Sequence, residues 1–347
     1  MDNSQILIDN FNTNLIKHKE KYGVYDLKNA KSNKKLLKKR LKKIKKHPLY
    51  NKYKDLLPEK ITLDEVKYGI AIENSDLKTF PTDDKTDKNF DKLEETEVKI
   101  TEPIVVLSQT ADKQWSFVFG YNFIGWLKTK YIAFISQNDF INYNNYEKEN
   151  FVITLDTITK IYNKEIGMGT KFKIYAENNN YYSIKFPTKD KNNNFEYKII
   201  NVDKNLNFNK GFLPYSEQKL VEQAEKYIGM KYKWGGRVDG VDCSGYLNNI
   251  FSVFNINLPR NSSQISKAFA KKNKKIEKAK IGDIIYFPGH IMLYIGNNEI
   301  LHSVGIYYKN NVKYQSMIVE KDNLNEISRA NGKTFLQNIK YIGNPLK

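Results

Sequence analysis

The spacing of hydrophobic and polar residues changes along the chain, and each change predicts a different kind of structure. Within the first sixty residues, Leu37, Leu41 and Ile44 recur at helical spacing in a Lys-rich run that stops near Pro48. This spacing predicts an amphipathic helix whose outer face carries lysines. We therefore expect a Lys-rich, largely helical N-terminal segment over residues 1–60.

Short β-rich runs replace the helical spacing after residue 61. Several short strands at close intervals, separated by turn residues, are typical of small β-barrels. We expect two such barrels in series, over residues 61–137 and 148–206. The runs that predict them are 105–107, 115–119, 125–127, 151–153, 157–162, 171–175, 181–186 and 197–202.

From residue 213 onward the pattern is mixed. Ser216 is placed to cap one helix, and apolar residues at helical spacing predict a second helix from Cys243 to Phe254. Alternating segments over 283–287, 290–295 and 299–303 then predict three strands. Helices followed by antiparallel strands indicate an α+β unit over residues 213–347.

The charge of the chain is concentrated in one place. The 57 basic residues exceed the 39 acidic ones by 18, and Lys31–Lys46 contains ten basic residues and no acidic one. Two interpretations remain open: a solvated helix face packed on the body, or a surface that binds an anionic wall polymer or lipid. No nucleic acid is expected as a partner, because no base-reading motif accompanies the lysines.

The chain contains a single cysteine, Cys243, so no intramolecular disulfide can form. It begins the second predicted helix, where unpaired N–H groups and the helix dipole favour a thiolate over a thiol. This position suits a nucleophile. The alternative is a buried, inert cysteine.

Two of the four histidines, His290 and His302, lie in neighbouring predicted strands. A two-residue loop at 297–298 puts them on opposite faces, whereas a three-residue loop at 296–298, or a bulge, puts them on one face. On one face they could serve a cysteine as base and orienting group. The alternatives are structural histidines or a metal site with Cys243; we expect no metal or other cofactor, since no carboxylate or water arrangement of a catalytic zinc is indicated.

These features occur within a set of motifs that resembles one family. The motifs are Tyr232–Gly236, Asp242–Gly245, Leu258–Gln264, Gly282–Phe287, Gly289–His290 and Leu301–Ser303. Their order resembles the NlpC-type papain-like cysteine peptidases, which cut bacterial cell-wall peptides. Upstream, Phe80–Thr82 and Gly125–Trp126 look like bacterial SH3-like domains. The resemblance implies an α+β papain-like catalytic domain preceded by two small SH3-like β-barrels and a helical basic N-terminal segment.

The resemblance also implies roles for individual residues. Cys243 would be the nucleophile, His290 the general base and His302 the group that orients His290, consistent with the logic of a catalytic triad. The backbone N–H of Cys243 and the hydroxyl of Tyr232 would stabilise the oxyanion. In the subgroup with SH3-like domains, Asp242 matches the group that holds the free amine of a wall peptide. The positions that would hold its D-Glu carboxylate are Ser244, Arg260 and Ser262.

Glu102 and Tyr121 are expected to reach the cleft from the first barrel, whereas Trp115 and Trp126 are expected in the barrel core. For Ser262 a helix N-cap is the alternative. The expected activity is cleavage of the γ-D-glutamyl-diamino acid bond in peptidoglycan stem peptides.

Three alternatives to that activity remain open: an N-acetylmuramoyl-L-alanine amidase, an acyltransferase on the same fold, or a non-catalytic wall-binding protein. Residues 1–27 show no signal peptide, and no long apolar run predicts a transmembrane segment. We expect an extracytoplasmic location, in the periplasm or cell envelope, if a leader is trimmed. Otherwise we expect cytoplasmic recycling of muropeptides.

Overall fold

The computed structural model describes residues 3–87, 90–146, 150–271, 275–309, 312–314, 316–328 and 332–346. The chain folds into two compact units. An α+β unit contains residues 1–22, 155–157 and 212–347, and a β unit contains residues 23–154 and 158–211. The segment predicted over residues 1–60 is therefore divided between the two units. The domain boundaries predicted from the sequence stay predictions.

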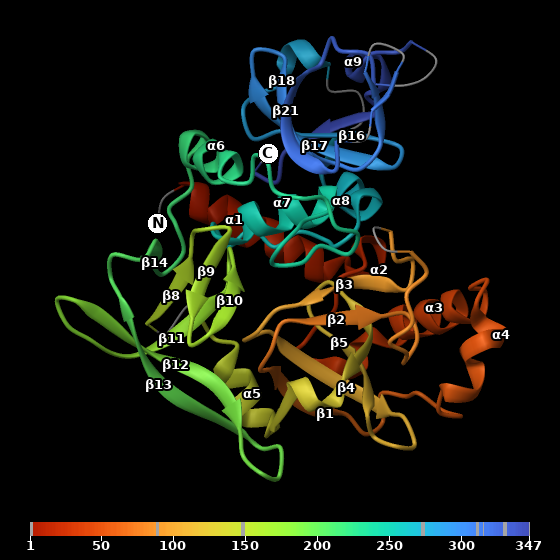
Figure 1. Cartoon of the computed structure of the whole chain (residues 1–347), viewed down its shortest axis with the longest axis vertical. Helices are drawn as coiled ribbons and strands as arrows, with labels where there is room; N and C mark the ends of the chain where they lie inside the picture. Colours follow the sequence, from red (N-terminus) through yellow and green to blue (C-terminus); the bar gives the residue numbers. More distant parts are fainter. Residues whose placement is uncertain are drawn as a thin grey trace. The chain divides into compact units, whose positions relative to one another are not determined.

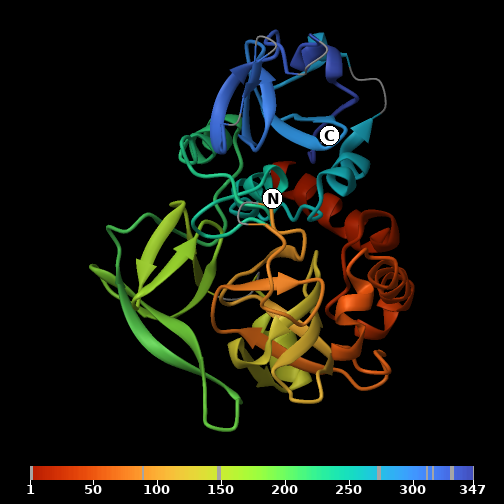
Figure 2. The ribbon, with the colours of Figure 1, turned by 45° about the vertical axis from the view of Figure 1, so that its right-hand side comes forward.

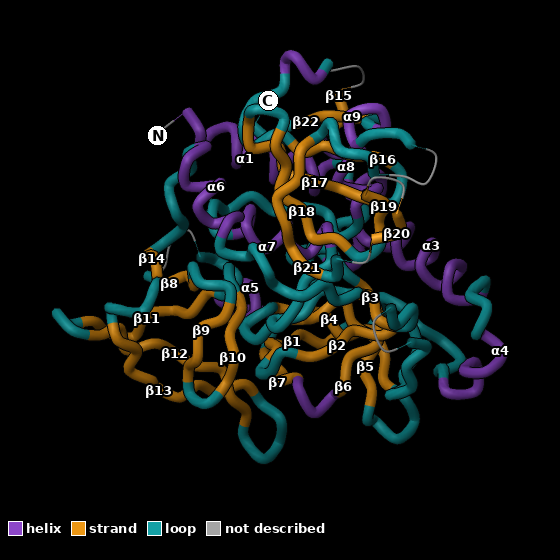
Figure 3. Tube along the Cα trace, turned by 45° about the horizontal axis from the view of Figure 1, so that its top comes forward, coloured by secondary structure: helices purple, strands orange, loops and turns teal. Residues whose placement is uncertain are grey.

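The α+β unit contains an antiparallel sheet of six strands, in the order β15-β22-β16-β17-β18-β21. Figures 1 and 3 show β16, β17 and β18 side by side within this unit. Its strands are β15 (Ala270–Lys271), β16 (Ile284–Phe287), β17 (His290–Gly296), β18 (Glu299–Val304), β21 (Ile318–Asn323) and β22 (Tyr341–Gly343), with a separate pair β19 (Tyr307–Lys309) and β20 (Val312–Tyr314). Its helices are α1 (Asn3–Lys17), α2 (Lys19–Tyr22), α6 (Glu217–Glu225), α7 (Cys243–Ser252), α8 (Ser262–Phe269) and α9 (Phe335–Asn338), with a short 3-10 helix at Ile276–Lys278.

Helix α7 forms where the sequence predicts it. The Asp242 side chain caps it by accepting a hydrogen bond from the Gly245 N–H. Leu247, Ile250 and Phe251 are fully buried, on the apolar face that the helical spacing predicted. The three predicted strands are confirmed as β16, β17 and β18.

Helix α1 belongs to the α+β unit, which no pattern in the sequence predicted. Phe11 of α1 stacks on Phe269 of α8 with ring centroids 5.1 Å apart. The amide of Asn12 donates to the carbonyl oxygen of Asn255 at 2.7 Å and accepts from the N–H of Asn257 at 3.1 Å. Figure 2 shows α1, in red, lying beside the helices of this unit.

The β unit begins with a seven-stranded antiparallel sheet in the order β3-β2-β6-β5-β4-β1-β7. Its strands are β1 (Lys67–Ala71), β2 (Ser75–Lys78), β3 (Glu94–Val98), β4 (Pro103–Gln109), β5 (Trp115–Phe119), β6 (Ile124–Lys128) and β7 (Ile132–Ile135). Its helices are α3 (Lys34–Lys45), α4 (Tyr50–Tyr53) and α5 (Gln137–Tyr143), with 3-10 turns at Ala30–Asn33, Lys54–Leu56 and Thr129–Tyr131.

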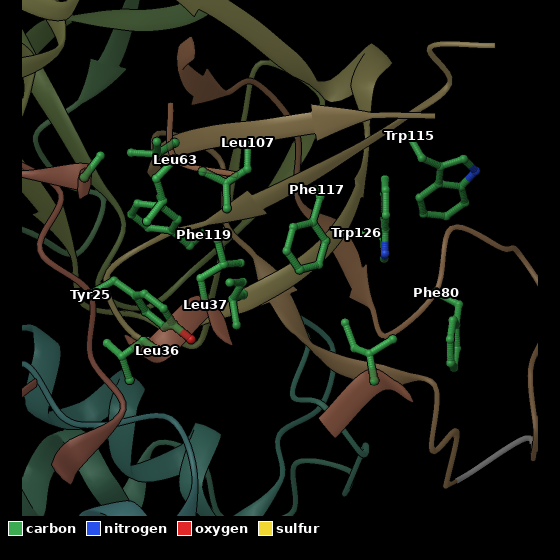
Figure 4. Packing of buried hydrophobic residues seen from close by; sticks show 14 of the residues in the cluster. Tyr25, Leu36, Leu37, Leu63, Phe80, Leu107, Trp115, Phe117, Phe119 and Trp126 are labelled. Carbon is green, nitrogen blue, oxygen red and sulfur yellow. The ribbon is translucent and has the colours of Figure 1, made fainter. Parts of the chain in front are cut away.

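The amphipathic helix predicted in the basic run is confirmed as α3. Leu36, Leu37 and Ile44 are buried in the same apolar cluster as Phe117 and Trp126 of the sheet. Figure 4 shows Leu36, Leu37, Phe117 and Trp126 within this cluster. The helix is therefore packed on the first β region, with its lysines exposed. The expectation that Trp115 and Trp126 lie in the core is confirmed, since they are 8% and 0% exposed.

The second β region has a five-stranded sheet in the order β13-β12-β11-β8-β14 and a two-stranded sheet, β10-β9. Its strands are β8 (Phe151–Thr154), β9 (Ile158–Ile161), β10 (Lys164–Gly167), β11 (Lys171–Glu177), β12 (Tyr181–Lys189), β13 (Phe195–Asp203) and β14 (Phe208–Lys210). In both units, no helix among the described residues is long and apolar enough to cross a membrane.

A buried ion pair in the β unit leads to a stability prediction. Lys78 Nζ lies 2.5 Å from Asp91 Oδ2, and both side chains are less than 10% exposed. Removing one partner leaves a buried charge uncompensated, so we expect Asp91→Ala to lower the free energy of unfolding by about 3–5 kcal/mol. Asp83→Ala is the matched control, because Asp83 pairs with Lys128 at 2.6 Å but is 73% exposed. We expect it to cost about 0–1 kcal/mol. Urea unfolding of both variants, followed by circular dichroism, gives the comparison; equal costs would contradict the prediction.

Candidate active site

Cys243 is the first residue of α7, and its sulfur lies against the start of β17. The backbone N–H groups of Ile291 and Ser244 are hydrogen-bonding partners of the thiol. Ile291 directly follows His290 in the chain, so the sulfur is next to the residue that the sequence predicts as the base. The segment before Cys243 is held in place by Ser303 of β18, whose hydroxyl donates to the Val241 carbonyl oxygen at 2.6 Å.

The connection between the strands of His290 and His302 contains a bulge, one of the two features that would place both histidines on one face. Asn297 and Asn298 both have positive φ and form a tight two-residue turn, and the strand register shifts between Tyr294 and Gly296. This bulge supplies the extra residue needed to put His290 and His302 on one face. The bulge that we named as an alternative to the longer loop is confirmed.

The two histidines are in direct contact and extend to a third residue. His290 Nε2 lies 2.7 Å from His302 Nδ1, and His302 Nε2 lies 2.9 Å from Asp322 Oδ2. His302 is fully buried and Asp322 is 5% exposed, whereas His290 is partly exposed. The site therefore presents a row of three polar side chains that starts next to the thiol and ends inside the unit.

Asp322 was not among the site residues predicted from the sequence. It lies on β21, which pairs with β18 so that Asp322 is opposite Ile300 and one diagonal step from His302. Strand β21 was not predicted, and only its pairing register brings Asp322 to the histidine. The weak apolar start of that strand at Ile318–Val319 is the sole signal in the sequence.

Three of the predicted substrate-binding residues form one buried network. Arg260 Nη2 donates to Asp242 Oδ2 at 2.7 Å, and Arg260 Nη1 donates to the Ser244 hydroxyl at 2.8 Å. Arg260 also donates to the Gly235 carbonyl oxygen at 2.6 Å. Gly235 and its neighbour Gly236 have φ of 84° and 65°, a left-handed conformation that favours glycine. The network therefore holds the glycine turn against the start of α7.

Ser262 is not part of that network. It is the first residue of α8 and is partly exposed. The cap position belongs to Asn261, whose carbonyl oxygen accepts from the Ile265 N–H at 2.9 Å. The interpretation of Ser262 as the N-cap is therefore wrong, and its contact with a carboxylate stays a prediction. Glu102 and Tyr121 lie in the β unit, and their approach to the cleft also stays a prediction.

The expectation of a lowered cysteine pKa is wrong. The pKa of the Cys243 thiol is raised to about 12, mainly by burial and also by the neighbouring Asp242 carboxylate, while Arg260 and the two backbone N–H groups act in the opposite direction. The helix start is present, but desolvation of the sulfur is the larger effect. Burial likewise raises the pKa of Tyr232, with the charges of Cys243 and Asp242 adding to the shift. Its hydroxyl therefore remains a proton donor at neutral pH.

The raised pKa predicts how the thiol reacts with an alkylating reagent. Because only the thiolate is nucleophilic, the rate of alkylation by iodoacetamide should rise about tenfold per pH unit between about pH 7 and 10. Cys243 is the only cysteine, so intact-mass spectrometry reports this one site. A rate that is already maximal and constant between pH 6 and 8 would indicate a preformed thiolate–imidazolium pair and would contradict the prediction.

The described residues include one trio that could hold a metal ion, and it differs from the alternative raised by the sequence. His302, Glu320 and Asp322 each offer a ligand atom, and these atoms lie within 4.8 Å of one another. Cys243 and His290 do not belong to it. Both ring nitrogens of His302 already lie within hydrogen-bonding distance of protein partners, so a metal would have to displace one of these contacts.

A thiol at a helix start beside a sheet that presents a histidine row defines a site of the cysteine-hydrolase class on a papain-like α+β fold. Residues 229–327 match the NlpC/P60 family, and residues 79–128 match the SH3 domain (SH3b1 type). The chain therefore contains an NlpC/P60 domain with an SH3b-type domain upstream, which agrees with the predicted α+β catalytic domain and the first predicted barrel. The second SH3-like barrel, predicted over residues 148–206, stays a prediction.

Individual relatives agree with this assignment. A probable endopeptidase NlpC homolog from Haemophilus influenzae is 32% identical over 99 residues, which are 27% of this chain and 53% of the relative. A gamma-D-glutamyl-L-lysine dipeptidyl-peptidase from Bacillus subtilis is 30% identical over 105 residues, which are 26% of this chain and 35% of the relative. The chain thus spans between about a third and a half of the length of these relatives.

The fold extends beyond the matched sequence. The structure of an NlpC/P60 endopeptidase from Photobacterium damselae subsp. piscicida aligns with a TM-score of 0.64 at 19% sequence identity. The alignment covers 81% of this chain and 73% of that protein. At this identity the likeness shows a shared fold.

Proposed function

We propose that this protein is a cysteine peptidase that hydrolyses peptidoglycan stem peptides at the γ-D-glutamyl-diamino acid bond. The observation that carries the proposal is the row His290–His302–Asp322 beside the sulfur of Cys243. The NlpC/P60 match supports the reaction class, and the relative described as a gamma-D-glutamyl-L-lysine dipeptidyl-peptidase supports the bond.

The hydrogen-bond row fixes where protons lie in the proposed mechanism. An ionised Asp322 can only accept, so the proton of neutral His302 is on Nε2 and its Nδ1 accepts. His290 then donates from Nε2 to His302, which leaves its Nδ1 as the basic nitrogen. Nδ1 of His290 therefore takes the proton of Cys243 as the sulfur attacks the amide carbonyl carbon.

The remaining steps follow from acyl transfer. The tetrahedral oxyanion is stabilised by the backbone N–H of Cys243 and by the Tyr232 hydroxyl, which stays protonated. His290 returns the proton to the leaving amine, and a thioester remains on Cys243. Water, deprotonated by His290, then attacks the thioester carbon and releases the acid and the free thiol.

The proposed role of Asp322 gives a prediction. In Asp322→Asn the side-chain amide can donate to His302 Nε2, which favours the opposite tautomers of both histidines. We expect kcat to fall at least about 10- to 100-fold, the loss seen when a group that orients a metal-binding histidine is replaced, and at most about 10⁴-fold, the loss when the Asp next to a catalytic His becomes Asn. A change in the pH dependence of kcat/KM should accompany the loss, and Asp322→Glu should restore part of the activity. A variant with wild-type kcat and pH profile would remove Asp322 from the mechanism.

Substrate binding is proposed at the start of α7. Asp242, Ser244 and Arg260 are proposed to hold the amine and the D-Glu carboxylate, together with Ser262, Glu102 and Tyr121. Because Asp242 and Arg260 already pair with each other, a bound peptide would have to exchange with this ion pair. We therefore propose two roles for the network of Asp242, Ser244 and Arg260. It positions Cys243, and its charged groups exchange their mutual ion pair for contacts with the amine and carboxylate of the substrate.

Digestion of purified sacculi tests the bond assignment. Each activity exposes a different new amine, which can be labelled and identified by mass spectrometry. Cleavage at the proposed bond exposes the α-amine of the diamino acid, whereas an amidase exposes the amine of L-Ala. New L-Ala amines would favour the amidase, and products joined to an added acceptor amine would favour the acyltransferase. Binding without any product would favour a wall-binding protein.

A second partner is proposed for the basic helix α3. Its buried face leaves Lys38, Lys39 and Lys42 exposed, among other lysines of the run Lys31–Lys46. We propose that this face binds an anionic polymer of the cell wall, with the envelope as the site of action. Retention on purified wall should fall with salt, and replacing these three lysines by Gln should reduce the salt dependence. Retention that salt does not change would contradict the proposal.

A further inference from the structure

The β unit contains a cavity of about 590 Å³ that no part of the proposed peptidase mechanism uses. Its walls come from β7 and α5 on one side and from the β12–β13 hairpin on the other, with Lys173 of β11 also in the lining. Figure 1 shows the hairpin and α5 side by side within this unit. A backbone hydrogen bond from the Phe134 N–H to the Asn193 carbonyl oxygen, 2.8 Å long, joins the two walls. Cavities of about 300–1,000 Å³ hold small organic ligands.

Aromatic rings form much of the lining. Tyr143 and Phe195 meet edge to face with centroids 5.4 Å apart, and Tyr197 contributes a ring that is 46% exposed. Such a lining presents flat apolar surfaces next to polar edges, which suits the C–H faces of a sugar ring. Ser136 and Asn142 add a hydroxyl and an amide to the lining.

The charged groups of the lining favour an anion. Lys185 Nζ lies 5.1 Å from the centre of the Tyr197 ring, and among the described residues Lys185 has no carboxylate partner. Lys173, which is 9% exposed, donates to the Asn142 carbonyl oxygen at 3.1 Å. The single acidic lining residue, Asp139, accepts at 2.6 Å from Ser136, the cap of α5. The lining thus carries two ammonium groups against one carboxylate, a net positive charge that favours an anionic ligand, and Lys173 and Asp139 each already hold a hydrogen bond within the lining.

We propose that this cavity is a second ligand site that binds a saccharide bearing a carboxylate, such as an amino sugar with an acidic substituent. The rings of Tyr143, Phe195 and Tyr197 contact the sugar faces, and Lys185 and Lys173 pair with the carboxylate. The site acts independently of Cys243 and would hold a glycan while the α+β unit acts on a peptide. Its existence does not depend on which peptide bond is cleaved.

Two disaccharides that differ in their carboxylate test the site. The acidic probe is N-acetylglucosaminyl-N-acetylmuramic acid, and the neutral control is N,N′-diacetylchitobiose. Isothermal titration calorimetry of the whole chain of residues 1–347 should show that the acidic disaccharide binds about tenfold more tightly, the gain expected from one charge-assisted contact. Equal affinities, or no binding of the acidic probe, would overturn the proposal. So would tighter binding of the dipeptide L-Ala-D-Glu that depends on Lys185, because the ligand would then be an acidic peptide.

Matched lysine variants locate the binding. Lys185→Gln should lose the roughly tenfold preference for the acidic disaccharide. Lys198→Gln should keep it, because Lys198 is exposed on the same hairpin but lies outside the cavity, over the Tyr162 ring. If both variants lost the preference equally, the overall positive charge of the protein, and not this cavity, would attract the ligand. Peptide cleavage measured in parallel should be unchanged in both variants, which separates failure of this site from failure of the proposed peptidase.

Discussion

Replacing Cys243 by Ala should abolish peptide cleavage while leaving the fold intact. The substitution removes one sulfur atom, and no other cysteine in the chain can replace it as nucleophile. The helix start does not depend on the thiol, because Asp242 supplies the cap. Loss of a nucleophile that acts together with its base typically costs on the order of 10⁶-fold in kcat. We expect cleavage of a purified muropeptide to fall to the uncatalysed background of the assay.

Circular dichroism and the thermal midpoint provide the control for this variant. We expect an unchanged spectrum and a free energy of unfolding within about 1 kcal/mol of the wild type, since the change removes a single atom. Cys243→Ser keeps the shape of the side chain but offers an alcohol, a much weaker nucleophile at neutral pH. Its activity should also be lost. Undiminished cleavage by a folded Cys243→Ala protein would exclude the cysteine mechanism.

Replacing His290 by Gln should have the second largest effect. Gln can still reach the His302 ring as a hydrogen-bond partner, but it cannot accept the proton of the thiol. Because the pKa of Cys243 is raised to about 12, the thiol is neutral at pH 7 and needs a base to become nucleophilic. We therefore expect kcat to fall about 10²- to 10⁴-fold.

His18 offers a matched control for this substitution. It is an exposed histidine of the same α+β unit and lies at the end of α1. His18→Gln should keep wild-type activity. The activity left in His290→Gln should increase with pH, because hydroxide then replaces the missing base. Residual activity that falls as the pH rises would contradict a general-base role for His290.

The sequence was sufficient for the features that depend on local patterns. Helix α7 follows from the spacing of Leu247, Ile250 and Phe251, and α3 follows from Leu37 and Ile44. Side chains on strands alternate strictly between faces, so the placement of His290 and His302 on one face depended only on the loop between their strands. It required either a three-residue loop or a bulge. The bulge at Ile295 then met that condition. These predictions succeeded because a periodic pattern determines which side of an element is buried.

Properties that depend on tertiary contacts could not be predicted in this way. Asp322 reaches His302 only through the pairing of β21 with β18, which no local pattern specifies. The docking of α1 through Phe11 and Phe269 likewise joins residues that are far apart in the sequence. The pKa of Cys243 was predicted in the wrong direction, because the helix start is visible in the sequence whereas the burial of the sulfur is not.

Product analysis on one defined peptide tests the central proposal most directly. The wild type and Cys243→Ala are incubated with the tripeptide L-Ala-γ-D-Glu-diaminopimelic acid, and the products are identified by liquid chromatography and mass spectrometry. We predict L-Ala-D-Glu and free diaminopimelic acid from the wild type, and intact tripeptide from the variant. Release of free alanine by the wild type, or the same two products from Cys243→Ala, would contradict the proposal.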